Sequence, residues 1–214
     1  MDILISILGW FTLGLLITAL IISILRKGNK GLVPIQIYIF ISIIGYVLDI
    51  VFKQKIESII INISTLLEIF FIYYFLYFNI KNSVFRKLII LLFIIYFFIC
   101  TAYWILRKNA ILSFDPTLYG IESLLIIIPC LFYIYELLKS NLLISLKSDA
   151  NFISICGLLF YFSISIPTYF SWYTLYYLSP GFDKILTILI ITCYMLLIVS
   201  FIKAYLCPIP DQQR

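Results

Sequence analysis

The chain contains no histidine, and only 12% of its residues are charged. The first absence excludes His-ligated zinc sites, Ser-His-Asp triads and haem held by an axial His. Paired aspartates for intramembrane proteolysis are also missing, since Asp49 and Asp183 are the only aspartates within apolar stretches. There is no phosphate-binding loop of the P-loop type either. We therefore predict a protein that is not an enzyme and has neither a metal site nor a cofactor.

Apolar residues make up 64% of the chain, and they occur in continuous runs. A bilayer core of about 30 Å is crossed by about 20 helical residues. Stretches of that length cover residues 3–25, 33–52, 57–80, 87–106, 118–138, 151–178 and 182–205. We predict an all-α, polytopic transmembrane bundle of seven helices, forming one domain over 1–206 with a short cytoplasmic tail at 207–214. The abundance of Ile, Asn and Lys indicates an AT-rich bacterial genome, and hence a multi-pass protein of the inner membrane.

Basic residues are distributed unequally between the two ends of these helices. Ten Lys and Arg residues lie at the helix ends and links on the same side of the membrane as the C-terminus, and five lie on the opposite side. Under the positive-inside rule, this asymmetry predicts that the N-terminus is outside and the C-terminus is cytoplasmic. Trp10, Trp104 and Trp172 then fall in the outer halves of their helices, where interfacial tryptophans are common. No basic domain remains to bind nucleic acid.

Four of the expected helices carry polar or small residues at helical spacing, and each set therefore shares one face. We call these sets the polar stripes, and they predict which faces point into the bundle, although close helix packing alone also favours small and hydroxyl residues. Their members are Tyr38, Ser42, Gly45 and Asp49; Ser58, Asn62, Thr65 and Glu68; Tyr119, Glu122, Ser123, Cys130 and Tyr133; and Ser154, Gly157, Tyr161, Ser165, Thr168 and Trp172. Phe162, Ile166 and Phe170 are expected on the opposite, lipid-facing side of the last of these helices.

Glu68 is the acidic residue nearest the middle of an expected helix. A charged acid there costs about 2.5 to 3.5 kcal/mol on insertion scales, so we predict a largely neutral, hydrogen-bonded carboxyl group. Asp49 and Glu122 lie about one turn from the outer helix ends, where either water or a pocket would accommodate them. Glu136 is expected in a solvated pair with Lys139.

If the acids face one cavity, the outer half of the bundle contains a polar pocket that binds a ligand or a proton. The candidate residues are Glu68, Asp49, Glu122, Asn62, Thr65, Tyr161, Ser165 and Thr168. Pro129 and Pro167 interrupt two of the helices that would line it and predict kinks there.

Three functions fit this pattern. The first is a sensor or signalling subunit that binds a small molecule or lipid and relays the signal to a protein partner in the cytoplasm or membrane. The second is a small transporter or channel that uses Glu68 as a proton or cation site. The third is an assembly subunit that packs against another membrane protein.

The segments from Asn62 to Lys87 and from Asp115 to Lys139 each combine an acid in the apolar run with a basic inner end. In this they resemble a family of small bacterial seven-helix membrane proteins. The resemblance extends over most of the chain. It implies the seven-helix fold and no particular activity.

The charge asymmetry makes a direct topological prediction. Cytoplasmic reporters should be active when fused after Lys30, Lys81, Lys147 and Arg214. External reporters should be active when fused after Lys55, Arg107 and Pro180. A cytoplasmic signal after Lys55 together with an external one after Arg214 would reverse the orientation.

Overall fold

The structure is a computed structural model that describes residues 1–26, 30–51, 57–106, 115–139, 149–178 and 181–208. These residues form α-helices and one short 3₁₀ turn, with no strand among them, which confirms the predicted all-α bundle of seven helices. The helices are α1 (Asp2–Leu25), α2 (Val33–Val51), α3 (Glu57–Asn79), α4 (Ser83–Leu106), α5 (Pro116–Lys139), α6 (Ala150–Leu178) and α7 (Phe182–Leu206), and η1 (Lys30–Leu32) precedes α2.

The largest departure from the expected boundaries is at α4, which begins at Ser83 rather than at 87. Asn82 explains the earlier start, because its side-chain oxygen accepts a hydrogen bond of 2.8 Å from the backbone N–H of Val84. This is the bond made by a residue that caps a helix N-terminus. The apolar pattern missed this first turn because the charged Arg86 lies at its end.

Aspartates cap the next two helices in the same way. Asp115 accepts from the backbone N–H of Thr117 at 2.9 Å, and Asp149 accepts from that of Asn151 at 2.8 Å. Pro116 occupies the first position of α5, where its missing N–H costs nothing. These polar caps fix where α5 and α6 begin.

Glu136, near the end of α5, is bound to the start of α4. Its two carboxylate oxygens accept hydrogen bonds from the backbone N–H groups of Lys81 at 2.9 Å and Asn82 at 2.7 Å. The prediction of a solvated pair with Lys139 was wrong, because the nearby backbone donors bind both oxygens. This contact joins two helix ends in place of a surface ion pair.

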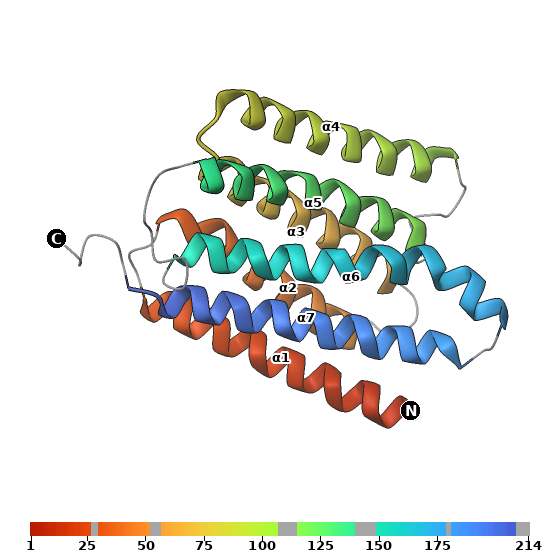
Figure 1. The fold of residues 1–214 in the computed structure, drawn as a ribbon. Helices are drawn as coiled ribbons and strands as arrows, with labels where there is room; N and C mark the ends of the chain where they lie inside the picture. The colour runs from red at the N-terminus through yellow and green to blue at the C-terminus, as the bar shows by residue number, and fades with distance from the viewer. Residues whose placement is uncertain (27–29, 52–56, 107–114, 140–148, 179–180, 209–214) are drawn as a thin grey trace.

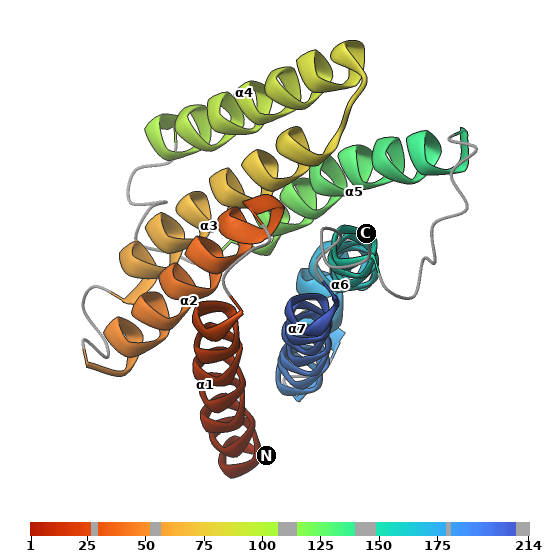
Figure 2. The same cartoon turned by 90° about the vertical axis from the view of Figure 1, so that its left-hand side faces the viewer.

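The helices lie side by side, with α4 at one edge of the bundle and α1 at the other (Figure 1). α6 packs between α5 and α7, α2 packs along α3, and α1 contacts both α7 and α2. Figure 2 shows α2, α3 and α5 on one side of the bundle and α6 and α7 on the other. The N-terminus and the end of α7 lie at opposite ends of the bundle (Figure 1).

Apolar side chains fill the interior and also cover the outside. Leu16, Phe75 and Phe201 are at most 1% exposed, whereas Phe98 is 67% exposed and Leu106 is 82% exposed. Five helices, namely α1, α4, α5, α6 and α7, are long and apolar enough to cross a membrane, and α2 has a shorter apolar stretch. A surface this apolar requires a lipid environment, so the chain is a membrane protein.

The predicted packing face of α6 is largely buried. Ser154, Ser165 and Thr168 are at most 4% exposed, and Phe170 on the other side is 48% exposed, as expected. Phe162 was expected to face lipid but is only 4% exposed. Because α6 lies between α5 and α7, more than one of its faces is covered. The assumption that only the polar stripe of α6 is buried therefore does not hold.

Gly157 provides the test of this packing. A β-carbon at Gly157 would collide with the side chain of Ser200 on α7, whereas one at Gly14 would meet nothing within 4 Å. Gly157→Leu should therefore destabilise the bundle by about 1 to 3 kcal/mol or more, as overpacking does. Gly14→Leu and Ile166→Val should stay close to wild type. The measurement is the unfolding temperature in detergent, and an unchanged value for Gly157→Leu would show that α6 and α7 do not meet there.

Candidate functional site

Glu68 lies in a cavity at the junction of the bundle's two sides. The cavity has a volume of about 280 Å³ and is lined by residues from α1, α2, α3, α6 and α7. Its polar lining is unusual for a membrane interior. We call it the Glu68 cavity, and its polar side chains are Thr12, Ser42, Tyr46, Ser64, Thr65, Glu68, Tyr161 and Tyr194.

Groups from two other helices surround the carboxyl group of Glu68. The hydroxyl of Ser42 on α2 is in hydrogen-bond contact with Glu68, and the hydroxyl of Tyr194 on α7 contacts Ser42 in turn. Tyr38 donates to the Tyr194 hydroxyl oxygen at 3.3 Å. The Ser42 hydroxyl also donates to the carbonyl of Tyr38 at 3.0 Å. The acid that the sequence places within an apolar helix thus has polar neighbours from α2 and α7.

Charge and aromatic rings give this cavity a chemical preference. Glu68 is the only carboxylic acid among the described lining residues, which include no Lys or Arg. The rings of Tyr161 and Tyr194 lie 5.7 Å apart at 59° on one wall. An acid beside aromatic rings suits a cation or a hydrogen-bond donor, because a ring face attracts positive charge.

Glu122 lies in a second, much smaller space, which we call the Glu122 hollow. Its volume of about 10 Å³ is comparable with the space that one water molecule needs. Glu122 is 7% exposed and accepts a hydrogen bond of 3.4 Å from the hydroxyl of Tyr96. Of the two alternatives for Glu122, an interface exposed to water or a pocket within the protein, its burial favours the pocket. The buried indole N–H of Trp104, which also lines the hollow, has no acceptor within the described part of the chain.

Thr65 connects the two spaces, because it lines both of them. The hydroxyl of Tyr119 is in hydrogen-bond contact with Thr65 and donates to the side-chain oxygen of Asn62 at 3.3 Å. The structure thus divides the predicted outer pocket into two adjacent parts. Tyr161 belongs to the Glu68 cavity, Asn62 belongs to the Glu122 hollow, and Thr65 belongs to both.

Ser165 and Thr168, two further candidates, line neither space. Ser165 and Thr168 are buried, and their hydroxyls bond to carbonyls of their own helix at 2.9 and 2.7 Å. This bonding is typical of hydroxyl residues within transmembrane helices. Asp49 lies on α2, but its side chain is outside the described residues.

Sequence reasoning missed the contributions of α1 and α7. Thr12 and Tyr194 line the Glu68 cavity, yet no polar stripe was assigned to α1 or α7. Tyr96 was likewise overlooked as one of many aromatics in α4. A search for single hydroxyl-bearing residues at matching depth in all helices would have found all three.

Comparisons of the chain with protein-family models, curated proteins and solved structures find no match. The site therefore has to be interpreted from its own geometry. In the described part of the chain, no three His, Cys, Asp or Glu side chains come close enough to hold a metal ion together.

Proposed function

We propose that the protein is a membrane-embedded receptor subunit that binds a small cationic ligand at Glu68 and relays the binding to a cytoplasmic partner. The observation that supports this most strongly is the position of the Glu68 cavity. Its walls come from α2 and α3 on one side of the bundle, from α6 and α7 on the other, and from α1, which packs against both α7 and α2. A ligand there touches both parts of the bundle at once.

The lining favours an amine or a similar cation. A buried acid without a basic neighbour gains most from a ligand that brings a positive charge or hydrogen-bond donors. Tyr161 and Tyr194 add ring faces beside it. The volume of about 280 Å³ lies just below the range of about 300 to 1,000 Å³ typical of small-molecule pockets, so the ligand is small.

Binding shifts a conformational equilibrium only if the ligand contacts the two states differently. A ligand between Glu68 and Tyr161 resists closure of α6 onto α3. Pro167 lies further along α6 and lacks the N–H of a helix hydrogen bond, and Figure 1 shows α6 bending over its last turns. We propose that movement of α6 carries the signal to its first turn, at the opposite end of the helix.

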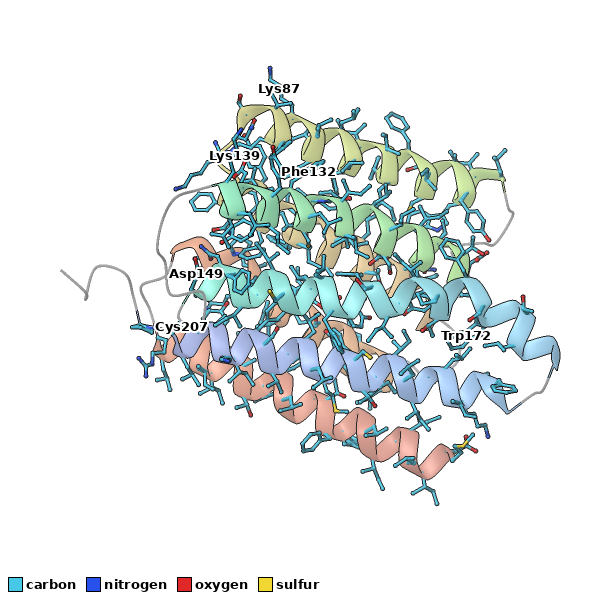
Figure 3. The ribbon with its side chains drawn as sticks, viewed as in Figure 1. Lys87, Phe132, Lys139, Asp149, Trp172 and Cys207 are labelled. Atoms are coloured by element: carbon cyan, nitrogen blue, oxygen red, sulfur yellow. The ribbon has the colours of Figure 1, made fainter. Side chains whose placement is uncertain are left out.

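In this proposal all seven helices cross the inner membrane of a bacterium, with the N-terminus outside. Lys87, Lys139 and Cys207 lie at one end of the bundle and Trp172 lies towards the other (Figure 3). The basic residues thus gather at the end that the positive-inside rule assigns to the cytoplasm. A signalling partner would bind at this end.

The contacts of Thr65 favour a second candidate, a proton- or cation-coupled transporter. Thr65 lines both the Glu68 cavity and the Glu122 hollow, and the Tyr119 hydroxyl contacts it. Two acids whose spaces share a hydroxyl-bearing residue resemble the proton relays of membrane transporters. If the protein is such a transporter, both Glu68 and Glu122 would be needed for transport.

Glu68→Gln tests the proposal, with Glu122→Gln as its matched control. The purified protein would be titrated with a panel of small primary amines, with the rise in unfolding temperature as the readout of binding. The receptor proposal predicts that Glu68→Gln folds normally but loses at least tenfold in amine affinity, whereas Glu122→Gln binds like wild type. The amide keeps the shape of the acid but cannot carry its charge.

Uptake of the same amines into proteoliposomes under a pH gradient separates the two candidates. A receptor catalyses no uptake, whereas a coupled transporter loses flux in both variants. If no amine stabilises the wild-type protein, or if Glu68→Gln binds as well as wild type, the Glu68 cavity is not the ligand site.

A further inference from the structure

A second cavity, of about 650 Å³, lies at the end of the bundle where α3 and α5 end and α4 and α6 begin. We call it the Lys81 cavity. Three basic side chains line it, those of Lys81, Arg86 and Lys139. Its position is at the edge of the membrane-spanning region, near the labelled Lys139 and Asp149 in Figure 3.

The two acids of this cavity are engaged by backbone groups. Glu136 accepts from the backbone N–H groups that precede α4, as described above. Asp149 accepts from those of Asn151 at 2.8 Å and Phe152 at 3.0 Å. The ion pair found among the described residues joins Lys184 and Asp2, at the other end of the bundle. The positive charges of the Lys81 cavity therefore have no acidic side chain bound to them within the described chain.

An aromatic groove of about 180 Å³ runs between α3 and α4. We call it the Tyr77 groove, and its lining includes Tyr74, Tyr77, Ile90 and Phe93. Its surface is almost wholly apolar, and its α4 side is at the edge of the bundle, where lipid meets the protein (Figure 1). An acyl chain fits such a groove better than any polar molecule does.

Arg86 brings the cavity and the groove together. Its guanidinium group lines the Lys81 cavity and lies 5.5 Å from the centre of the Tyr77 ring, which lines the groove. Its Nε donates to the carbonyl of Ile80 at 2.5 Å, which fixes the side chain in this position. A cavity with three basic and two acidic side chains, and hence a net charge of +1, thus adjoins an apolar groove at Arg86.

We propose that the Lys81 cavity and the Tyr77 groove together bind an anionic phospholipid. The phosphate lies among Lys81, Arg86 and Lys139, and one acyl chain lies along the groove. Basic pockets between membrane helices on the cytoplasmic side suit anionic headgroups, and guanidinium groups bind phosphate through paired hydrogen bonds. A free phosphate compound would use the cavity alone and leave the groove unused. The proposal does not depend on the function of Glu68.

The charge test compares two double variants of the full chain in nanodiscs of phosphatidylcholine. Lys81→Gln with Lys139→Gln removes two cations from the cavity. Lys87→Gln with Lys203→Gln removes the same charge from helices at the same end, but neither residue lines the cavity. The measurement is the affinity for a fluorescent phosphatidylglycerol, with phosphatidylcholine as the neutral lipid. Loss of two surface cations predicts about 30-fold weaker binding in the cavity variant, and the control should lose much less.

The groove test uses Ile90→Trp, which fills the groove, and Leu91→Trp, which lies outside it; the native residues are 47% and 50% exposed. Ile90→Trp should weaken lipid binding severalfold, and Leu91→Trp should not. Glycerol 3-phosphate in water, which lacks acyl chains, should compete only weakly.

Three results would overturn the lipid proposal. Equal losses of phosphatidylglycerol affinity in the two double lysine variants would mean that the basic residues attract anionic lipid generally and form no specific site. Tight binding of glycerol 3-phosphate with no effect of Ile90→Trp would identify a soluble phosphate compound instead. No preference for phosphatidylglycerol over phosphatidylcholine in the wild-type protein would exclude any anionic site here.

Discussion

The constraint on which the structure depends is that hydrocarbon offers no hydrogen-bond partners. A polar side chain within a membrane-spanning helix must find its partners inside the protein. Many described members of the polar stripes therefore lie buried inside the bundle, and hydroxyl groups such as those of Ser154 and Ser165 also bond to carbonyls of their own helix. Glu68 and Glu122 both have hydrogen-bond partners within the protein, but their surroundings differ. Glu122 accepts a hydrogen bond from Tyr96 beside a space of about 10 Å³, whereas Glu68 faces a space that is large enough for another molecule.

The difference in volume separates an acid that only water can reach from one that a small molecule could contact, as we propose for Glu68. The Glu122 hollow, of about 10 Å³, admits nothing larger than a water molecule. The Glu68 cavity, of about 280 Å³, lies where five helices meet and where α6 and α7 face α2 and α3. A ligand at Glu68 would hold two parts of the bundle together. The lysines at the other site lie at the edge of the membrane and would contact lipid headgroups, so the two proposed sites share no residue.

Much of this could be predicted from the sequence. Runs of apolar residues give the helices, and polar spacing finds the buried faces of α2, α3, α5 and α6. The rest depends on which helices are neighbours. Phe162 is buried because α6 lies between α5 and α7, and spacing within one helix cannot reveal that. The Glu68 cavity likewise depends on Thr12 and Tyr194 from α1 and α7, whose polar residues form no stripe. The start of α4 was missed because its cap, Asn82, precedes charged residues.

The central claim is that Glu68, unlike Glu122, faces a space that another molecule can enter. A hydrophobic carbodiimide reacts with neutral carboxyl groups that it can reach from the membrane, and peptide mass spectrometry identifies the modified residue. Treatment of the protein in native membranes should modify Glu68 and leave Glu122 unmodified, because a hollow of about 10 Å³ cannot admit the reagent. Modification of Glu122 with Glu68 left intact would contradict the account.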